Sequence, residues 1–211
     1  MKVAGKMLLT LNRYFCNFAV QMKKNAMENK ITLRTGILFL LILLAAVSRL
    51  LPHPYNFTPI GAMALFGAAH FERRWLAFVL PLAAMWLSDL ALNNILYSAY
   101  YDGFVWGGSA LVYASFALIA LLGMAVLRRF SWGRLLGSSL AASVIFFLVT
   151  NAGVWLSDPV YARDLTGLMA SYAAGLPFFG NTLLGDLFYC GALFGGYAFL
   201  AYRFPRLQPA A

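Results

Sequence analysis

Polar side chains inside apolar stretches are the first candidates for chemistry in this sequence. Asp186 lies within the otherwise apolar stretch 181–202. A helix of that length covers the roughly 30 Å hydrocarbon core of a bilayer. An ionised carboxylate there is costly unless a partner or a wet cavity receives it. Two interpretations stay open: Asp186 contacts a ligand, or a structural hydrogen bond holds it inside a helix bundle.

Further polar and aromatic residues collect towards one end of neighbouring apolar stretches. Several of them share helical faces, so they could converge on a pocket. The predicted substrate-binding residues are Arg49, Trp86, Asp89, Asn93, Asn151, Trp155, Asn181, Asp186 and Tyr189. In this pocket, carboxylates and amides would orient a ligand by hydrogen bonds, and the aromatic rings would supply stacking area.

Several of these residues also have a simpler interpretation. Arg49 would hold a ligand carboxylate, pair with the acids, or extend from a helix end to the membrane interface. Tryptophans and tyrosines of the outer loops are typical of the aromatic belt of membrane proteins. Asp89 could serve only to pair with Arg49.

The sequence does not predict an enzyme, a metal site or a cofactor. No nucleophile and base stand at helical spacing, and the HExxH pattern does not occur. The two cysteines, Cys16 and Cys190, lie far apart and give no metal-binding spacing. His53 and His70 fall at opposite ends of the predicted spans, so they cannot share one metal ion.

Composition indicates an all-α polytopic membrane protein. Hydrophobic residues make up 62% of the 211 residues and charged residues only 11%. A soluble domain of this length does not carry so little charge. The net charge of +9, much of it from the first 34 residues, indicates attraction to anionic lipid rather than to nucleic acid.

Six apolar stretches are predicted to cross the membrane: 35–51, 57–71, 75–92, 108–128, 134–156 and 181–202. The second is short and could be re-entrant; Thr58 is expected to cap its helix. Arginines follow the second, fourth and sixth stretches: Arg73, Arg74, Arg128, Arg129, Arg203 and Arg206. The positive-inside rule places these arginines and the basic N-terminal segment in the cytoplasm, which requires six spans with both termini inside.

Between the fifth and sixth spans, the sequence predicts an amphipathic helix lying at the interface. Asp158 and Pro159 mark its start, and apolar residues recur at helical spacing up to Leu176. We further expect three parts: a basic cytoplasmic leader (1–34) that is not needed for the fold, a transmembrane domain (35–204) and a cytoplasmic tail (205–211). Met22 and Met27 are alternative starts within the leader.

Four motifs carry a resemblance to a known family: LPHPYNFTPIGAMALFGAAHF, WLAFVLPLAAMWLSDL, FFLVTNAGVWLS and YAAGLPFFGNTLLGDLFY. Over residues 36–202 the chain resembles small bacterial membrane proteins of unknown function that are catalogued with a proposed transport role. It is more distantly similar to the S components of energy-coupling-factor vitamin transporters. Such S components often present an AxxxA face on the first helix to their coupling partner, whereas here Ala64 and Ala68 offer one on the second.

From these features we expect a multi-pass protein of the bacterial cytoplasmic (inner) membrane that captures or takes up a small, vitamin-like nutrient from outside. Its expected partners are that small molecule, the lipid bilayer and a membrane subunit or gradient that supplies energy, with no nucleic acid. The alternative is a non-catalytic accessory subunit that packs into a larger membrane complex through small-residue faces such as Gly191 and Gly195.

Overall fold

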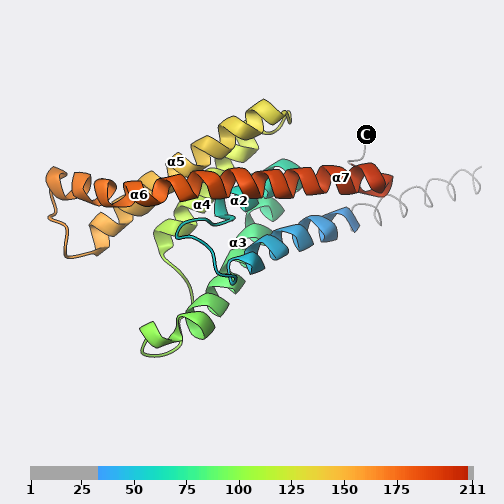
Figure 1. Cartoon of the computed structure of the whole chain (residues 1–211). Coiled ribbons are helices and arrows are strands. Elements are labelled where there is room, and N and C mark those ends of the chain that lie inside the picture. Colours follow the sequence, from blue (N-terminus) through green and yellow to red (C-terminus); the bar gives the residue numbers. More distant parts are fainter. Residues whose placement is uncertain (1–32, 209–211) are drawn as a thin grey trace, which may run out of the picture. The chain divides into compact units, whose positions relative to one another are not determined.

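The computed structural model describes residues 33–208, and this part of the chain folds into helices and turns without a β-strand (Figure 1). Most of the predicted basic leader lies outside the described residues. The helices are Leu33–Ser48, α2 (Ile60–His70), α3 (Arg74–Ala91), α4 (Ala110–Val126), α5 (Trp132–Ser157), α6 (Leu165–Cys190) and α7 (Gly196–Arg203). Shorter turns are the π-helical η1 (Leu92–Leu96) and η3 (Gly191–Gly195) and the 3₁₀-helical η2 (Ser98–Tyr100) and η4 (Pro205–Leu207).

Three helical stretches are long and apolar enough to cross a membrane: Arg74–Leu96, Trp132–Ser157 and Leu165–Arg203. The other apolar helices, Leu33–Ser48, Ile60–His70 and Ala110–Val126, are shorter. These lengths and compositions indicate a membrane protein and confirm the all-helical prediction. They do not by themselves establish six separate spans.

The chain divides into two compact units. One consists of residues 1–37 and 200–211, and the other of residues 38–199. In the described part of the first unit, the Phe204 backbone N–H donates to the Leu200 carbonyl, and η4 follows directly. The second unit holds the hydrophobic core and every predicted substrate-binding residue.

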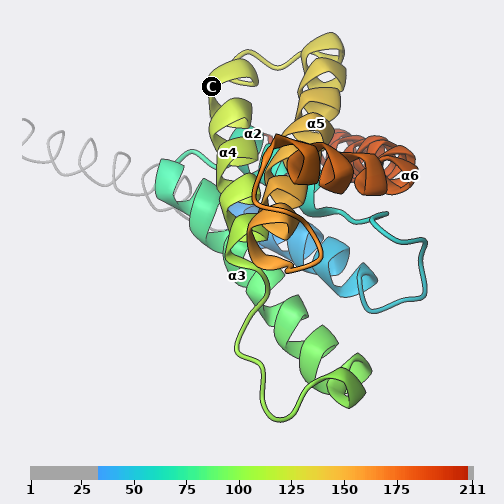
Figure 2. The ribbon, with the colours of Figure 1, turned by 90° about the vertical axis from the view of Figure 1, so that its left-hand side faces the viewer.

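Helix α2 lies at the centre of the second unit. It packs against α3, α4, α5 and α6 (Figure 2). From Ala62 to Phe66 its side chains have no exposed surface. Because α2 is apolar on every side, burial all round is the arrangement its sequence favours. Gly123 of α4 lets the two helices approach closely, since a methyl group there would lie 2.8 Å from the Ala68 Cβ.

The end of the chain forms one long helix where the sequence predicted two. Leu165–Arg203 is continuous through α6, η3 and α7, so there is no separate interfacial helix before the last span (Figure 1). Asp164, and not Asp158, caps its start by accepting from the Gly167 N–H. Pro177 removes one backbone donor, but no polar turn follows it, so the helix continues. Its 39 residues measure about 58 Å, well beyond the roughly 30 Å hydrocarbon core.

The segment between the first helix and α2 is not helical and packs along α6. The Asn181 side chain donates to the Tyr55 carbonyl at 3.0 Å, and the Tyr55 ring contacts Phe178. Gly185 lies against the backbone at residues 57–58, with no room for a side chain. Asn56 adopts a left-handed conformation with φ of 63°, which asparagine tolerates better than most residues.

Candidate functional site

Arg49 and Asp89 form a buried ion pair between the end of the first helix and α3. The Arg49 Nη1 lies 2.7 Å from the Asp89 Oδ1, and the side chains are only 11% and 7% exposed. Nη1 also donates to the Ser88 hydroxyl and, at 3.5 Å, to the Met85 carbonyl. The Tyr113 hydroxyl of α4 donates to the second oxygen, Asp89 Oδ2, at 2.7 Å. Of the alternatives for Arg49, the structure therefore shows pairing with an acid.

Asp186 is held separately from this pair. Its carboxylate accepts from the Ser143 hydroxyl at 2.6 Å and from the backbone N–H groups of Gly61 and Ala62. Those N–H groups belong to the first turn of α2, where backbone donors lack partners within the helix. The α2 N-terminus has no capping side chain of its own, so Asp186 takes the role that the sequence assigned to Thr58. A carboxylate at this position also suits the helix dipole.

Glycine at position 61 is required for this contact. A methyl group on Gly61 would lie 2.3 Å from the Asp186 Oδ1. The close approach explains how α6 can place a carboxylate directly over the end of α2. The structural interpretation of Asp186 thus has three protein donors behind it, and its contact with a ligand stays a prediction.

Two further predicted residues of α6 face the segment around residues 48–57. The Tyr189 and Ser48 hydroxyls lie 2.8 Å apart and share a hydrogen bond. The Tyr189 ring also contacts Phe57. Asn181 holds the same segment through the Tyr55 carbonyl. These side chains therefore attach the non-helical segment to α6.

Trp86 and Asn93 fasten the loop that follows η1. The Trp86 indole N–H donates to the Trp106 carbonyl at 2.7 Å, and the Asn93 amide donates to the Gly107 carbonyl at 3.3 Å. Sequence analysis missed Asn94, whose side chain both donates to and accepts from the backbone of Val105. The adjacent asparagines at the end of an apolar stretch were the available signal for this loop anchor.

Asn151 and Trp155 act at the α5–α6 interface. The Asn151 amide donates to the Phe147 carbonyl in its own helix. Its Oδ1 would lie 2.3 Å from a methyl group on Gly175, so the two helices approach closely there. Trp155 donates to the Ala162 carbonyl at 2.8 Å and closes the connection to α6. Asn151 also lines a cavity of about 410 Å³ between α5 and α6.

A larger cavity of about 500 Å³, called here the outer cavity, lies where the non-helical segment meets the end of α3. Its lining consists of Arg49, Leu50, Leu51, Pro52, His53, Pro54, Tyr55, Asn56, Thr58, Leu92, Leu96 and Tyr97. Arg49 is the only predicted substrate-binding residue among them. Sequence analysis missed His53, Asn56 and Tyr97 as lining residues, although it placed loops 52–56 and 94–107 over the predicted pocket.

The predicted pocket is thus divided by the structure into several local contacts. The Arg49–Asp89 pair borders the outer cavity, Asp186 caps α2, and the remaining residues attach loops and helices to one another. Across residues 33–208 there is no group of three or more His, Cys, Asp or Glu side chains that could hold a metal ion.

These features define a helical membrane protein with buried polar contacts between its helices. The chain belongs to the family described as "Family of unknown function (DUF6580)", which matches residues 29–207. No curated protein and no solved structure matches the chain.

Proposed function

We propose that this protein captures or takes up a small molecule at the outer face of the bacterial cytoplasmic membrane, with the outer cavity as the binding site. The observation that carries the proposal is a cavity of about 500 Å³ bordered by a buried ion pair, Arg49 with Asp89, in an apolar helical protein. That volume lies in the range of small-molecule pockets, which are roughly 300 to 1,000 Å³. The pair would give such a pocket a fixed polar end.

The backbone around the outer cavity supports this proposal. Non-helical backbone at membrane depth is tolerated where it is buried in protein or lines a cavity. Residues 50–58 line the outer cavity on one side, and the π-helical turn η1 contributes Leu92 and Leu96 on the other. Turns of this kind within helices are frequent at functional sites. Asn56, with its left-handed backbone, lines both this cavity and the smaller one beside Asn151.

The charge of the site favours a ligand that is polar but carries no net charge. Asp89 already neutralises Arg49 at 2.7 Å, so a second carboxylate would meet the repulsion of the first in a low-dielectric setting. Hydrogen-bonding groups remain at His53 and Asn56, and the rings of Tyr55 and Tyr97 offer stacking area. A small, partly aromatic nutrient with carbonyl or hydroxyl groups fits this lining.

The same features support six crossings with both termini in the cytoplasm. The 11 residues of α2 cover about 16 Å, which is too short for a span. Residues 52–59, in a mostly extended conformation, add up to about 25 Å. Segment and helix together are long enough to form one crossing. The arginines after α2, α4 and α7 then share the cytoplasmic side, and the outer cavity faces outwards.

Ligand retention tests the proposal. The full chain, purified gently from bacterial membranes, is extracted and its small molecules are identified by mass spectrometry. Leu96→Trp fills the outer cavity and is expected to abolish retention of the bound molecule. Leu136→Trp is the matched control, because Leu136 is similarly exposed on α5 (52% against 47%) and lines no described cavity. Equal retention by both variants, or no retained molecule in the parent protein, would contradict the proposal.

A second candidate function is an accessory subunit of a larger membrane complex. Gly191 and Gly195 have open space where a side chain would stand, with no atom within 4 Å. Such a small-residue face on a membrane helix allows close packing with another helix. Copurification separates the two candidates: a stable stoichiometric complex without a retained small molecule favours the accessory subunit.

A further inference from the structure

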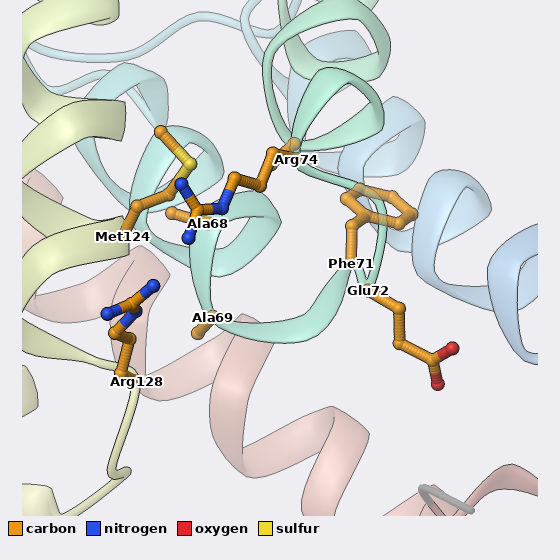
Figure 3. A pocket seen from close by; sticks show the side chains of 8 residues that line it. Ala68, Ala69, Phe71, Glu72, Arg74, Met124 and Arg128 are labelled. Carbon is orange, nitrogen blue, oxygen red and sulfur yellow. The ribbon is translucent and has the colours of Figure 1, made fainter.

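A second polar cavity lies at the opposite end of α3 from the outer cavity. It has a volume of about 200 Å³, and its lining consists of Ala68, Ala69, Phe71, Glu72, Arg74, Ala77, Met124 and Arg128. Figure 3 shows the side chains of Arg74 and Arg128 reaching towards one another across Ala68 and Met124, while the Glu72 carboxylate points away from them. Two guanidinium groups from different helices thus converge on one small cavity.

Neither guanidinium group has a partner within residues 33–208. Arg74 and Arg128 are exposed, and no hydrogen bond or ion pair joins either side chain to the described part of the protein. Two positive charges directed at one cavity repel each other unless an anion lies between them. Arginine is the residue best suited to hold such an anion when it is a phosphate, because its planar group forms paired hydrogen bonds to phosphate oxygens.

The position of the arginines identifies the source of the anion. Arg74 begins α3, and Arg128 follows the end of α4, so both stand where apolar helices end. Exposed apolar side chains continue from this point along the same helices, at Trp75 and Val79 on α3 and at Leu118 and Leu121 on α4. A phosphate seated in the cavity could therefore be continuous with acyl chains lying on these helices.

We propose that Arg74 and Arg128 form a specific site for the phosphate group of an anionic phospholipid. The cavity holds the phosphate between the two guanidinium groups, and Ala77 and Met124 form its apolar side. The acyl chains cover exposed surface of α3 and α4. This site is separate from the outer cavity and does not depend on the capture function. Basic pockets between membrane helices are the usual place for such headgroups.

Native mass spectrometry of the full chain in mild detergent tests the site. The protein is titrated with phosphatidylglycerol, and in parallel with zwitterionic phosphatidylcholine. We expect phosphatidylglycerol to be retained preferentially and the R74Q/R128Q variant to lose at least tenfold in its affinity, as expected for the loss of charge-assisted hydrogen bonds. The matched control is R73Q/R129Q, which removes the same number of charges from the neighbouring positions.

Further measurements assign each outcome. An equal loss in R73Q/R129Q would show diffuse attraction to a basic surface and overturn the site. R74K/R128K keeps the charges but lacks the paired hydrogen bonds, so an intermediate affinity supports the site, while full affinity contradicts it. Inorganic phosphate at millimolar concentration is added as a competitor: if it displaces the lipid completely, the site belongs to a free phosphate. All variants are compared at equal melting temperature in detergent, which these exposed positions should preserve.

Discussion

Replacing Asp186 by asparagine tests the central contact of the fold. The substitution keeps the shape of the side chain and removes its charge. In the parent protein the carboxylate accepts from the Ser143 hydroxyl and from two backbone N–H groups of α2. An asparagine has only one acceptor oxygen, and its amide nitrogen would face one of these donors. We therefore expect Asp186→Asn to destabilise the protein.

The size of this effect follows from the bonds that are lost. Hydrogen bonds to a charged group contribute about 1.5 to 3 kcal/mol. One kcal/mol shifts the melting temperature by roughly 2 to 4 °C in a domain of 150 to 250 residues. The expected decrease in detergent is therefore about 3 to 12 °C. Gly61→Ala should lower it as well, because the added methyl group would lie 2.3 Å from the carboxylate.

The assay is thermal unfolding in detergent, measured together with ligand retention. Asp102→Asn is the control, since Asp102 lies on an exposed loop and makes no hydrogen bond to the described residues; its melting temperature should not change. The capping role of Asp186 would be refuted if Asp186→Asn melted like the parent protein. Unchanged melting combined with loss of ligand retention would instead establish Asp186 as a ligand contact.

Three further predictions address the ion pair, the topology and the leader. Asp89→Asn leaves Arg49 buried without its counter-ion and should cost about 3 to 5 kcal/mol, seen as a larger melting shift than for Asp186→Asn; an unchanged melting temperature would show that the pair is not structural. Single cysteines at Ser131 and Asp102 should react with membrane-impermeant reagents from the cytoplasmic and the outer side respectively, and labelling of position 102 from the cytoplasm would refute six crossings. A chain that starts at Met27 retains the whole family match, so it should insert and stay monodisperse; aggregation of this shortened chain would show that the leader is structural.

Periodicity and composition were sufficient for the helices of the fold, but not for their lengths. The apolar stretches predicted α3, α4 and α5 to within a few residues. The continuous helix through Pro177 was missed because a proline inside an apolar pattern does not reveal whether the helix kinks, ends or continues. The shortness of α2 was visible in the sequence. The extended segment that precedes it depends on packing against α6, which local sequence does not encode.

The polar residues of the site were found correctly as a group, while their partners were not. A carboxylate in an apolar helix requires compensation, and this argument identified Asp89 and Asp186 from sequence alone. The partners of Asp186 are mainly backbone groups of Gly61 and Ala62. Backbone donors carry no residue-specific signal, and these lie more than a hundred positions away in the chain. Only the three-dimensional packing of α6 over the start of α2 could show that contact.

The contact between Asp186 and α2 also limits how this protein can move. A shift of one residue along a helix rotates its side chains by about 100°, so any sliding or turning of α6 against α2 would withdraw the carboxylate from the N–H groups of Gly61 and Ala62. Those buried donors would then be left without partners, at substantial cost. The two helices are therefore coupled in register and move as one rigid body. An opening that lets a molecule pass from the outer cavity towards the cytoplasm has to occur by displacement of α3 and α4 relative to this body.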